Sequence, residues 1–301
     1  MKTNDHIFHL IRSLKKSEKR HFKLFVSLHV IGEKNNYLKL YDAIEKQCQT
    51  ESGEYNEQAL RESLSEENFV NHLSESKYYL YKLLLKSLTV YHSGINPEFR
   101  VNEYIQQVQI LFDKGLYHQC ELLLQKAKPI AEKYELFAHL LELYGWEIEL
   151  MRLQAYYNKS EMDIEDLYVS IFGVLKKYSN LYSYSLMTSR IFSRRERVGF
   201  TRSKFELKKY EEIIHDKLFV SEDLALSYQA KYFYHMCHST YYFINEDLKK
   251  SYPQMHKLVK LIEGAPHQIQ KNPKSYVSIL NLSLIHISEP TRLRRISYAV
   301  F

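Results

Sequence analysis

The chain has 301 residues, of which 45% are hydrophobic and 26% charged, and its formal net charge is +6. This composition is typical of a folded globular protein, and no segment approaches the ~20 consecutive apolar residues that a membrane-spanning helix needs. Only eight glycines occur, and they are dispersed, which excludes the closely spaced glycines of a phosphate-binding loop.

The three cysteines, Cys48, Cys120 and Cys237, lie far apart in the sequence. Their odd number and wide spacing argue against a disulfide framework and favour a reducing compartment. At the N-terminus a short apolar run precedes a basic cluster, the reverse of the order in a secretory signal. We therefore expect a cytoplasmic protein that does not bind membranes.

The first part of the chain, residues 1–94, reads as a module of short helices. Several expected helices begin with a capping residue followed by carboxylates, as at Ser17 and Asn56. The predicted ranges are 4–14, 17–29, 36–47, 56–64 and 69–91.

A basic cluster lies within this module and consists of Lys15, Lys16, Lys19, Arg20 and Lys23. Such a cluster can follow a nucleic-acid backbone, although specific recognition would also need a helix held in a groove. The alternative interpretation is a solvated helix face that keeps the protein soluble.

Residues 101–134 show the clearest helical pattern of the chain. Apolar side chains recur at helical spacing from Val101 to Phe112, and again from Tyr117 to Tyr134, with Gly115 between the two runs. Two amphipathic helices joined by so short a turn must lie antiparallel and bury their facing stripes.

This helix pair resembles a tetratricopeptide repeat. Leu111, Gly115, Ala127 and Ala131 occupy positions that the repeat reserves for packing residues. Lys114, His118 and Tyr134 depart from the usual Leu, Tyr and Ala, and Pro129 is expected to kink or break the second helix. More broadly, residues 1–281 resemble a group of uncharacterised bacterial helical proteins with tetratricopeptide-like C-terminal regions. The resemblance implies a right-handed solenoid of helical hairpins over residues 98–281, and it implies no activity.

Further hairpins are predicted downstream. A long helix from residue 137 is followed by a partner near Ser160, a third pair covers 179–218 with a turn between Gly199 and Ser203, and a fourth pair begins after Ser221. Another helix opens after Pro273. The spacing between successive pairs lies in the range of helical-hairpin repeats.

The end of the chain has a different character. Residues 282–292, LSLIHISEPTR, and residues 296–301, ISYAVF, resemble in-frame translations of consecutive parts of a sequencing-library transposon adapter. We therefore expect 282–301 to be a non-native tail on a fragment whose natural sequence is cut near Asn281. Residues 282–301 hold three arginines and one glutamate, so the remainder carries a net charge of +4.

The candidate binding residues are Arg190, Arg194, Arg197 and Arg202. The first three follow a spacing of four and three residues, which aligns them on one face of a helix. On the concave side of a repeat array, such a face would bind an acidic or phosphorylated peptide through bidentate contacts. A solvated helix face, partly balanced by Glu196 and Glu206, is the alternative interpretation.

Catalytic and metal-binding patterns are absent from the sequence. His235, Cys237 and His238 are close in sequence, but a helix would point them in different directions, and zinc normally needs four ligands at paired spacings. We found no nucleophile elbow, no metalloprotease histidine pair and no carboxylates clustered with histidine. We therefore expect no enzymatic activity, no cofactor and no metal.

These observations predict an all-α protein in which a small N-terminal helical module precedes a tetratricopeptide-like solenoid. The predicted function is a non-catalytic scaffold that binds a protein or peptide, with an acidic segment favoured by the arginines. The alternative function is a nucleic-acid-associated regulator that uses the basic N-terminal cluster.

Overall fold

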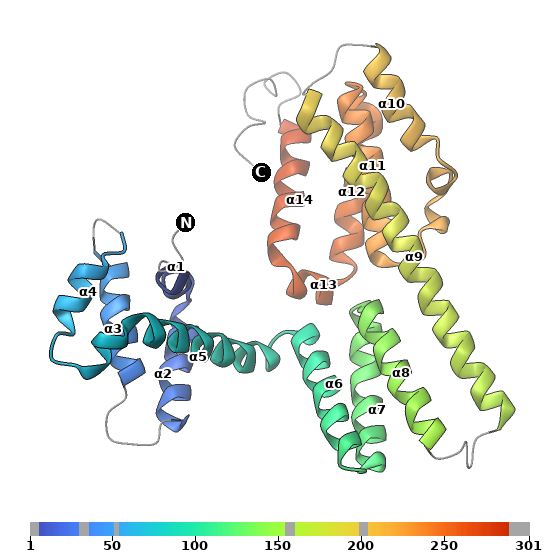
Figure 1. The fold of residues 1–301 in the computed structure, drawn as a ribbon. Helices are drawn as coiled ribbons and strands as arrows, with labels where there is room; N and C mark the ends of the chain where they lie inside the picture. The colour runs from blue at the N-terminus through green and yellow to red at the C-terminus, as the bar shows by residue number, and fades with distance from the viewer. Residues whose placement is uncertain (1–5, 30–35, 51–53, 154–159, 199–203, 289–301) are drawn as a thin grey trace. The chain divides into compact units, whose positions relative to one another are not determined.

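The computed structural model describes residues 6–29, 36–50, 54–153, 160–198 and 204–288. Within these ranges every regular element is helical (Figure 1). The prediction of an all-α protein is confirmed. The chain divides into two compact units, an N-terminal unit, Met1–Arg100, and a C-terminal unit, Val101–Phe301.

In the described residues of the N-terminal unit, five α-helices and a short 3₁₀ helix surround one apolar core. Buried side chains at helical spacing, such as Ile7, Phe8 and Ile11 of α1, meet Phe22, Leu40 and Leu84 in this core. The main chain of Lys15 donates to Glu18, and Asn56 accepts from Ala59, so both helix starts have a side-chain cap. The elements are α1 (His6–Ser13), α2 (Lys16–His29), α3 (Asn36–Cys48), α4 (Glu57–Ser63), η2 (Asn68–His72) and α5 (Leu73–Ser93).

The C-terminal unit continues as a series of antiparallel helices. Its elements are α6 (Pro97–Asp113), α7 (Tyr117–Lys133), α8 (Phe137–Leu153), α9 (Glu161–Val198), α10 (Lys204–Ile214), η3 (Lys217–Phe219), η4 (Glu222–Leu224), α11 (Tyr228–Ile244), α12 (Leu248–Glu263), α13 (Pro266–Lys271) and α14 (Pro273–Ser288). Neighbours in this series contact one another: α7 packs on α8, α8 on α9, α9 on α11, α11 on α12, and α12 on α14. These contacts are consistent with helical hairpins.

Three of the tight turns in this unit share one geometry. At Gly115, Glu135 and Glu246 the backbone has a positive φ of 73°, 51° and 58°. At each turn the residue after the positive-φ position donates to the carbonyl five residues back, as Leu116 does to Leu111 at 2.9 Å. This is the Schellman motif, which ends a helix. At each of the three turns the next helix begins two residues after the positive-φ position.

The predicted start of the third helix pair is wrong, because residues on both sides of Ser179 belong to one continuous helix, α9. The turn predicted between Gly199 and Ser203 lies outside the described residues. Of the two outcomes expected at Pro129, a kink or a break, the break does not occur, because α7 continues to Lys133. Residues 282–288 of the adapter-like segment extend α14, and residues 289–301 lie outside the described part of the chain.

Candidate functional site

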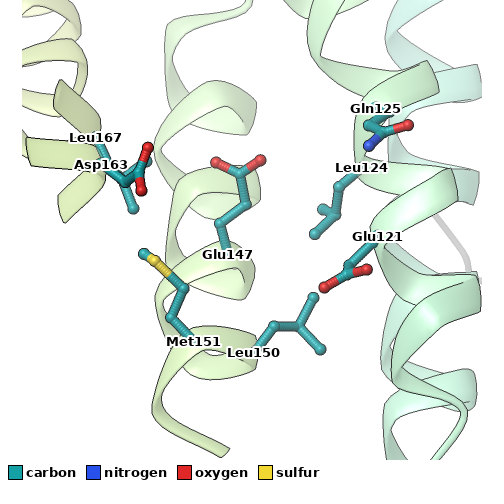
Figure 2. A pocket seen from close by; sticks show the side chains of 8 residues that line it. All are labelled: Glu121, Leu124, Gln125, Glu147, Leu150, Met151, Asp163 and Leu167. Carbon is teal, nitrogen blue, oxygen red and sulfur yellow. The ribbon is translucent and has the colours of Figure 1, made fainter. Parts of the chain in front are cut away.

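A hollow of about 360 Å³ opens between α7, α8 and α9 (Figure 2). Each helix contributes one carboxylate and at least one apolar side chain to its wall. The lining residues are Glu121, Leu124 and Gln125 of α7, Glu147, Leu150 and Met151 of α8, and Asp163 and Leu167 of α9. We call this feature the acidic hollow.

Helix geometry explains how these residues come together. On α7 and on α8 the lining residues follow the same spacing, a carboxylate and then side chains three and four residues later, which share one face of a helix. The Schellman turn at Glu135 makes the two helices antiparallel. Leu124, Leu150 and Met151 are buried, so the hollow has an apolar floor below its carboxylates.

The carboxylates have defined partners within the chain. Glu147 forms an ion pair of 2.7 Å with Lys128, whose ammonium also lies 5.2 Å from the centre of the Tyr144 ring. Glu121 lies 3.5 Å from Nδ1 of His118, and Asp163 accepts hydrogen bonds of 2.8 Å from the main chain and the hydroxyl of Ser160. Burial raises the pKa of Tyr144, which lies near Lys128 and Glu147.

This arrangement favours one kind of ligand group. An ammonium or guanidinium would gain charge-assisted hydrogen bonds from the carboxylates, and its methylene stem would cover the apolar floor. The described residues include no group of three or more histidine, cysteine or acidic side chains arranged to hold a metal ion.

Comparison with known proteins gives no assignment. No protein-family model, curated protein or solved structure matches this chain. The likeness to tetratricopeptide repeats therefore depends on the residues of the α6–α7 hairpin and on its turn at Gly115. Among the described helices, none is long and apolar enough to span a lipid bilayer.

The four predicted arginines have different environments. Arg190 is exposed on α9, and its guanidinium lies 3.7 Å from the sulfur of Met187. Arg194 is half-buried and donates to the main-chain carbonyl of Lys209 in α10, so it ties two helices of the same chain together. The side chain of Arg197 and the whole of Arg202 lie outside the described residues. The acidic-peptide site therefore stays a prediction.

The basic N-terminal cluster is partly neutralised by α3. Lys19 contacts Glu45 at 3.0 Å, and Lys23 contacts both Asp42, at 2.8 Å, and Glu45, at 3.1 Å. The hydrogen bond to Asp42 raises the pKa of Lys23. Lys15, Lys16 and Arg20 are exposed. Two of the five cations thus hold α2 against α3.

The histidines near Cys237 do not converge on a common point. His235 is buried and contacts Gln254 at 2.9 Å and Glu222 at 3.3 Å. His238 packs against Tyr234, with ring centres 4.5 Å apart, and neither of its ring nitrogens has a hydrogen-bond partner among the described residues. Burial lowers the pKa of His238 to about 4. His215 is exposed. This cluster contributes packing to α11.

The acidic hollow was not anticipated from the sequence. Its three carboxylates come from three helices and lie many residues apart, and each alone is an ordinary polar position on an amphipathic helix. One signal was present in the sequence. Glu147, Leu150 and Met151 repeat the spacing of Glu121, Leu124 and Gln125. It becomes informative once α7 and α8 are known to pack together.

Proposed function

We propose that this chain is a non-catalytic scaffold that binds a protein or peptide segment. We further propose that its helical hairpins stack as a right-handed, tetratricopeptide-like solenoid, and that the acidic hollow binds a lysine or arginine side chain of the partner. The observation that carries this proposal is that Glu121, Glu147 and Asp163, from three consecutive helices, line one hollow together with buried apolar side chains, while Lys128 pairs with Glu147.

The dimensions of the hollow support a side chain rather than a large cofactor. A volume of about 360 Å³ lies at the low end of the range for ligand pockets. It is open between helices, so a peptide can cross it while one long side chain enters. The arginine prediction pointed to an acidic partner, whereas the hollow favours a basic one.

Three short peptides test the proposal. They share one sequence and carry arginine, lysine or norleucine at the centre, and fluorescence anisotropy measures their binding to the full chain. We expect the cationic peptides to bind more tightly than the norleucine peptide, and their affinity to fall as salt rises, because exposed charges are screened.

The matching variant is the double change Glu121→Gln and Glu147→Gln, with Glu142→Gln as its control. Glu142 is exposed on α8 and does not line the hollow. The double variant should lose at least roughly tenfold in affinity for the cationic peptides, and the control should not. Equal binding of all three peptides, or an equal effect of the two variants, would remove the hollow as the binding site.

A further inference from the structure

One side of α9 exposes large apolar side chains in a row. Tyr168, Phe172, Leu175, Tyr182 and Leu186 are exposed by 39%, 63%, 42%, 60% and 57%. They belong to a helix whose other faces already contact α8, α10 and α11. We call these five residues, with Ser179 between them, the α9 stripe.

The α9 stripe has the periodicity of a coiled coil. Its members are separated alternately by four and three residues, with Ser179 occupying the position between Leu175 and Tyr182. Side chains at this spacing form a seam that a second helix covers by inserting its own side chains between them. The residues that α9 buries within its own unit, such as Leu181, Tyr184 and Ile191, lie on other sides of the helix. The stripe is therefore additional to the core.

Charge changes sign along this same face. Glu161 and Glu165 precede the stripe and are exposed, and Arg190 follows it and is exposed. The helix thus presents acidic, apolar and basic segments in order. A face with this order is complementary to a copy of itself turned end to end, because the acidic end then meets the basic end.

We propose that the α9 stripe is a homodimer interface in which two copies of α9 pack antiparallel about a two-fold axis. In one register Phe172 lies opposite Tyr182 of the second copy, Tyr168 opposite Leu186, and Glu165 opposite Ser189. Arg190 adjoins Ser189, so its long side chain can reach Glu165. Ser179 lies opposite Leu175 near the axis, where a small side chain allows close approach. Lys176 lies at the edge of the stripe, and its flexible stem lets the ammonium reach water.

The face extends over several turns of helix. Its apolar positions, 168–186, span somewhat under three heptads, and the charged residues at either end extend the face to 161–190, about 45 Å of helix. Because the two-fold axis repeats every contact, the Glu165–Arg190 pair occurs twice, once at each end of the interface.

Sedimentation equilibrium of the full chain tests the dimer, and Leu186→Glu tests its seam. The matched control is Ile110→Glu, because Ile110 is exposed by 56% on α6 and lies outside the stripe. We expect the unaltered chain and the control to dimerise, and Leu186→Glu to raise the dimer dissociation constant at least roughly tenfold. Circular dichroism checks that both variants keep their helices.

A charge exchange tests the antiparallel register. Glu165→Lys alone and Arg190→Glu alone each place like charges opposite one another and should weaken the dimer, whereas the double variant should restore it. A chain that is monomeric at all concentrations, or a dimer whose strength does not respond to Leu186→Glu, would overturn the proposal. Failure of the double variant to recover dimerisation would overturn the register. None of these changes touches the acidic hollow, so the result is independent of the proposed peptide binding.

Discussion

Glu135 has an unusual backbone conformation for a residue with a side chain. Its φ of 51° places it in the left-handed region, which costs an L-residue roughly 1–2 kcal/mol. Its carboxylate accepts hydrogen bonds from the main-chain N–H groups of Tyr228, at 2.8 Å, and Gln229, at 3.3 Å. These are orphan donors at the start of α11, where a negative charge is stabilising. The strain at one turn is thus offset by a cap on a helix nearly a hundred residues later.

Glu246 provides the comparison, since it has nearly the same backbone conformation in the same turn motif and is exposed. We expect Glu246→Gly to raise the free energy of unfolding by about 1 kcal/mol, because glycine adopts this conformation without steric cost. Glu135→Gly removes the same backbone strain but also removes two charge-assisted hydrogen bonds. It should therefore lower the free energy of unfolding by about 1–2 kcal/mol. Chemical denaturation followed by circular dichroism measures both. Shifts of the same sign and size would contradict the capping role.

His238 makes the stability of the chain depend on pH. Its pKa is about 4 in the folded protein, against about 6.5 in an unfolded chain, because burial disfavours the charged ring. Between these two values the unfolded state binds more protons, so stability is complete above pH ~6.5 and falls as the pH drops toward 4.

Replacing His238 with phenylalanine should remove this dependence. His238→Phe keeps the ring packing against Phe219 and Tyr234 and removes two buried nitrogens, so stability near pH 7.5 should be unchanged or higher. The loss of stability between pH 6.5 and pH 4.5 should be smaller than in the unaltered chain. Denaturation curves at both pH values measure the difference, with His256→Phe as an exposed control. An unchanged pH slope would show that His238 titrates with the same pKa in the folded and unfolded states.

At the scale of elements, the sequence predicted which segments are helical better than it predicted their ends. The α6–α7 hairpin was predictable because Gly115 marks the one turn, within the described part of the chain, where a positive φ coincides with glycine. The turns at Glu135 and Glu246 have the same geometry without that marker. The third helix pair was predicted to begin at Ser179, but this position lies inside α9, and the adjacent Asn180 bonds the main chain of Leu224 and Leu226, both at 3.0 Å. Its role is tertiary and has no local signature.

Alanine substitutions at two glycines should change the free energy of unfolding in opposite directions, because one glycine lies in a helix and the other in a turn. Gly173 lies inside α9, where an added Cβ would meet no atom within 4 Å, whereas Gly115 has a φ of +73°. Gly173→Ala should raise the free energy of unfolding by about 1 kcal/mol, because alanine loses less backbone entropy in a helix. Gly115→Ala should lower it by about 1–2 kcal/mol. Thermal and chemical denaturation test the pair, and a destabilising Gly173→Ala would show that α9 is interrupted there in solution.

For the whole molecule, the cores define which parts unfold together. The N-terminal unit has a core of its own, formed by residues from Ile7 to Leu84. Among its described residues the C-terminal unit has three cores. Phe233 of α11 packs against two of them, Met236 of α11 belongs to the third, and Glu135 connects the α7–α8 turn to α11. In an ideal repeat array each repeat contacts only its neighbours. This longer-range contact predicts that the C-terminal unit unfolds as one cooperative body.

The fluorescence of Trp146 reports the unfolding of the C-terminal unit, because it is the single tryptophan of the chain and packs against Phe112 in that unit. Leu40, Leu143 and Leu258 are fully buried, each in a different core, and truncation to alanine costs about 2–5 kcal/mol at such sites. We expect Leu143→Ala and Leu258→Ala to lower the denaturation midpoint reported by Trp146 fluorescence. Leu40→Ala should leave that midpoint in place while it shifts the part of the circular dichroism transition that belongs to the N-terminal unit. If Leu258→Ala left the Trp146 midpoint unchanged, α11–α14 would unfold separately from α6–α9, and the contact made by Glu135 would be too weak to couple them.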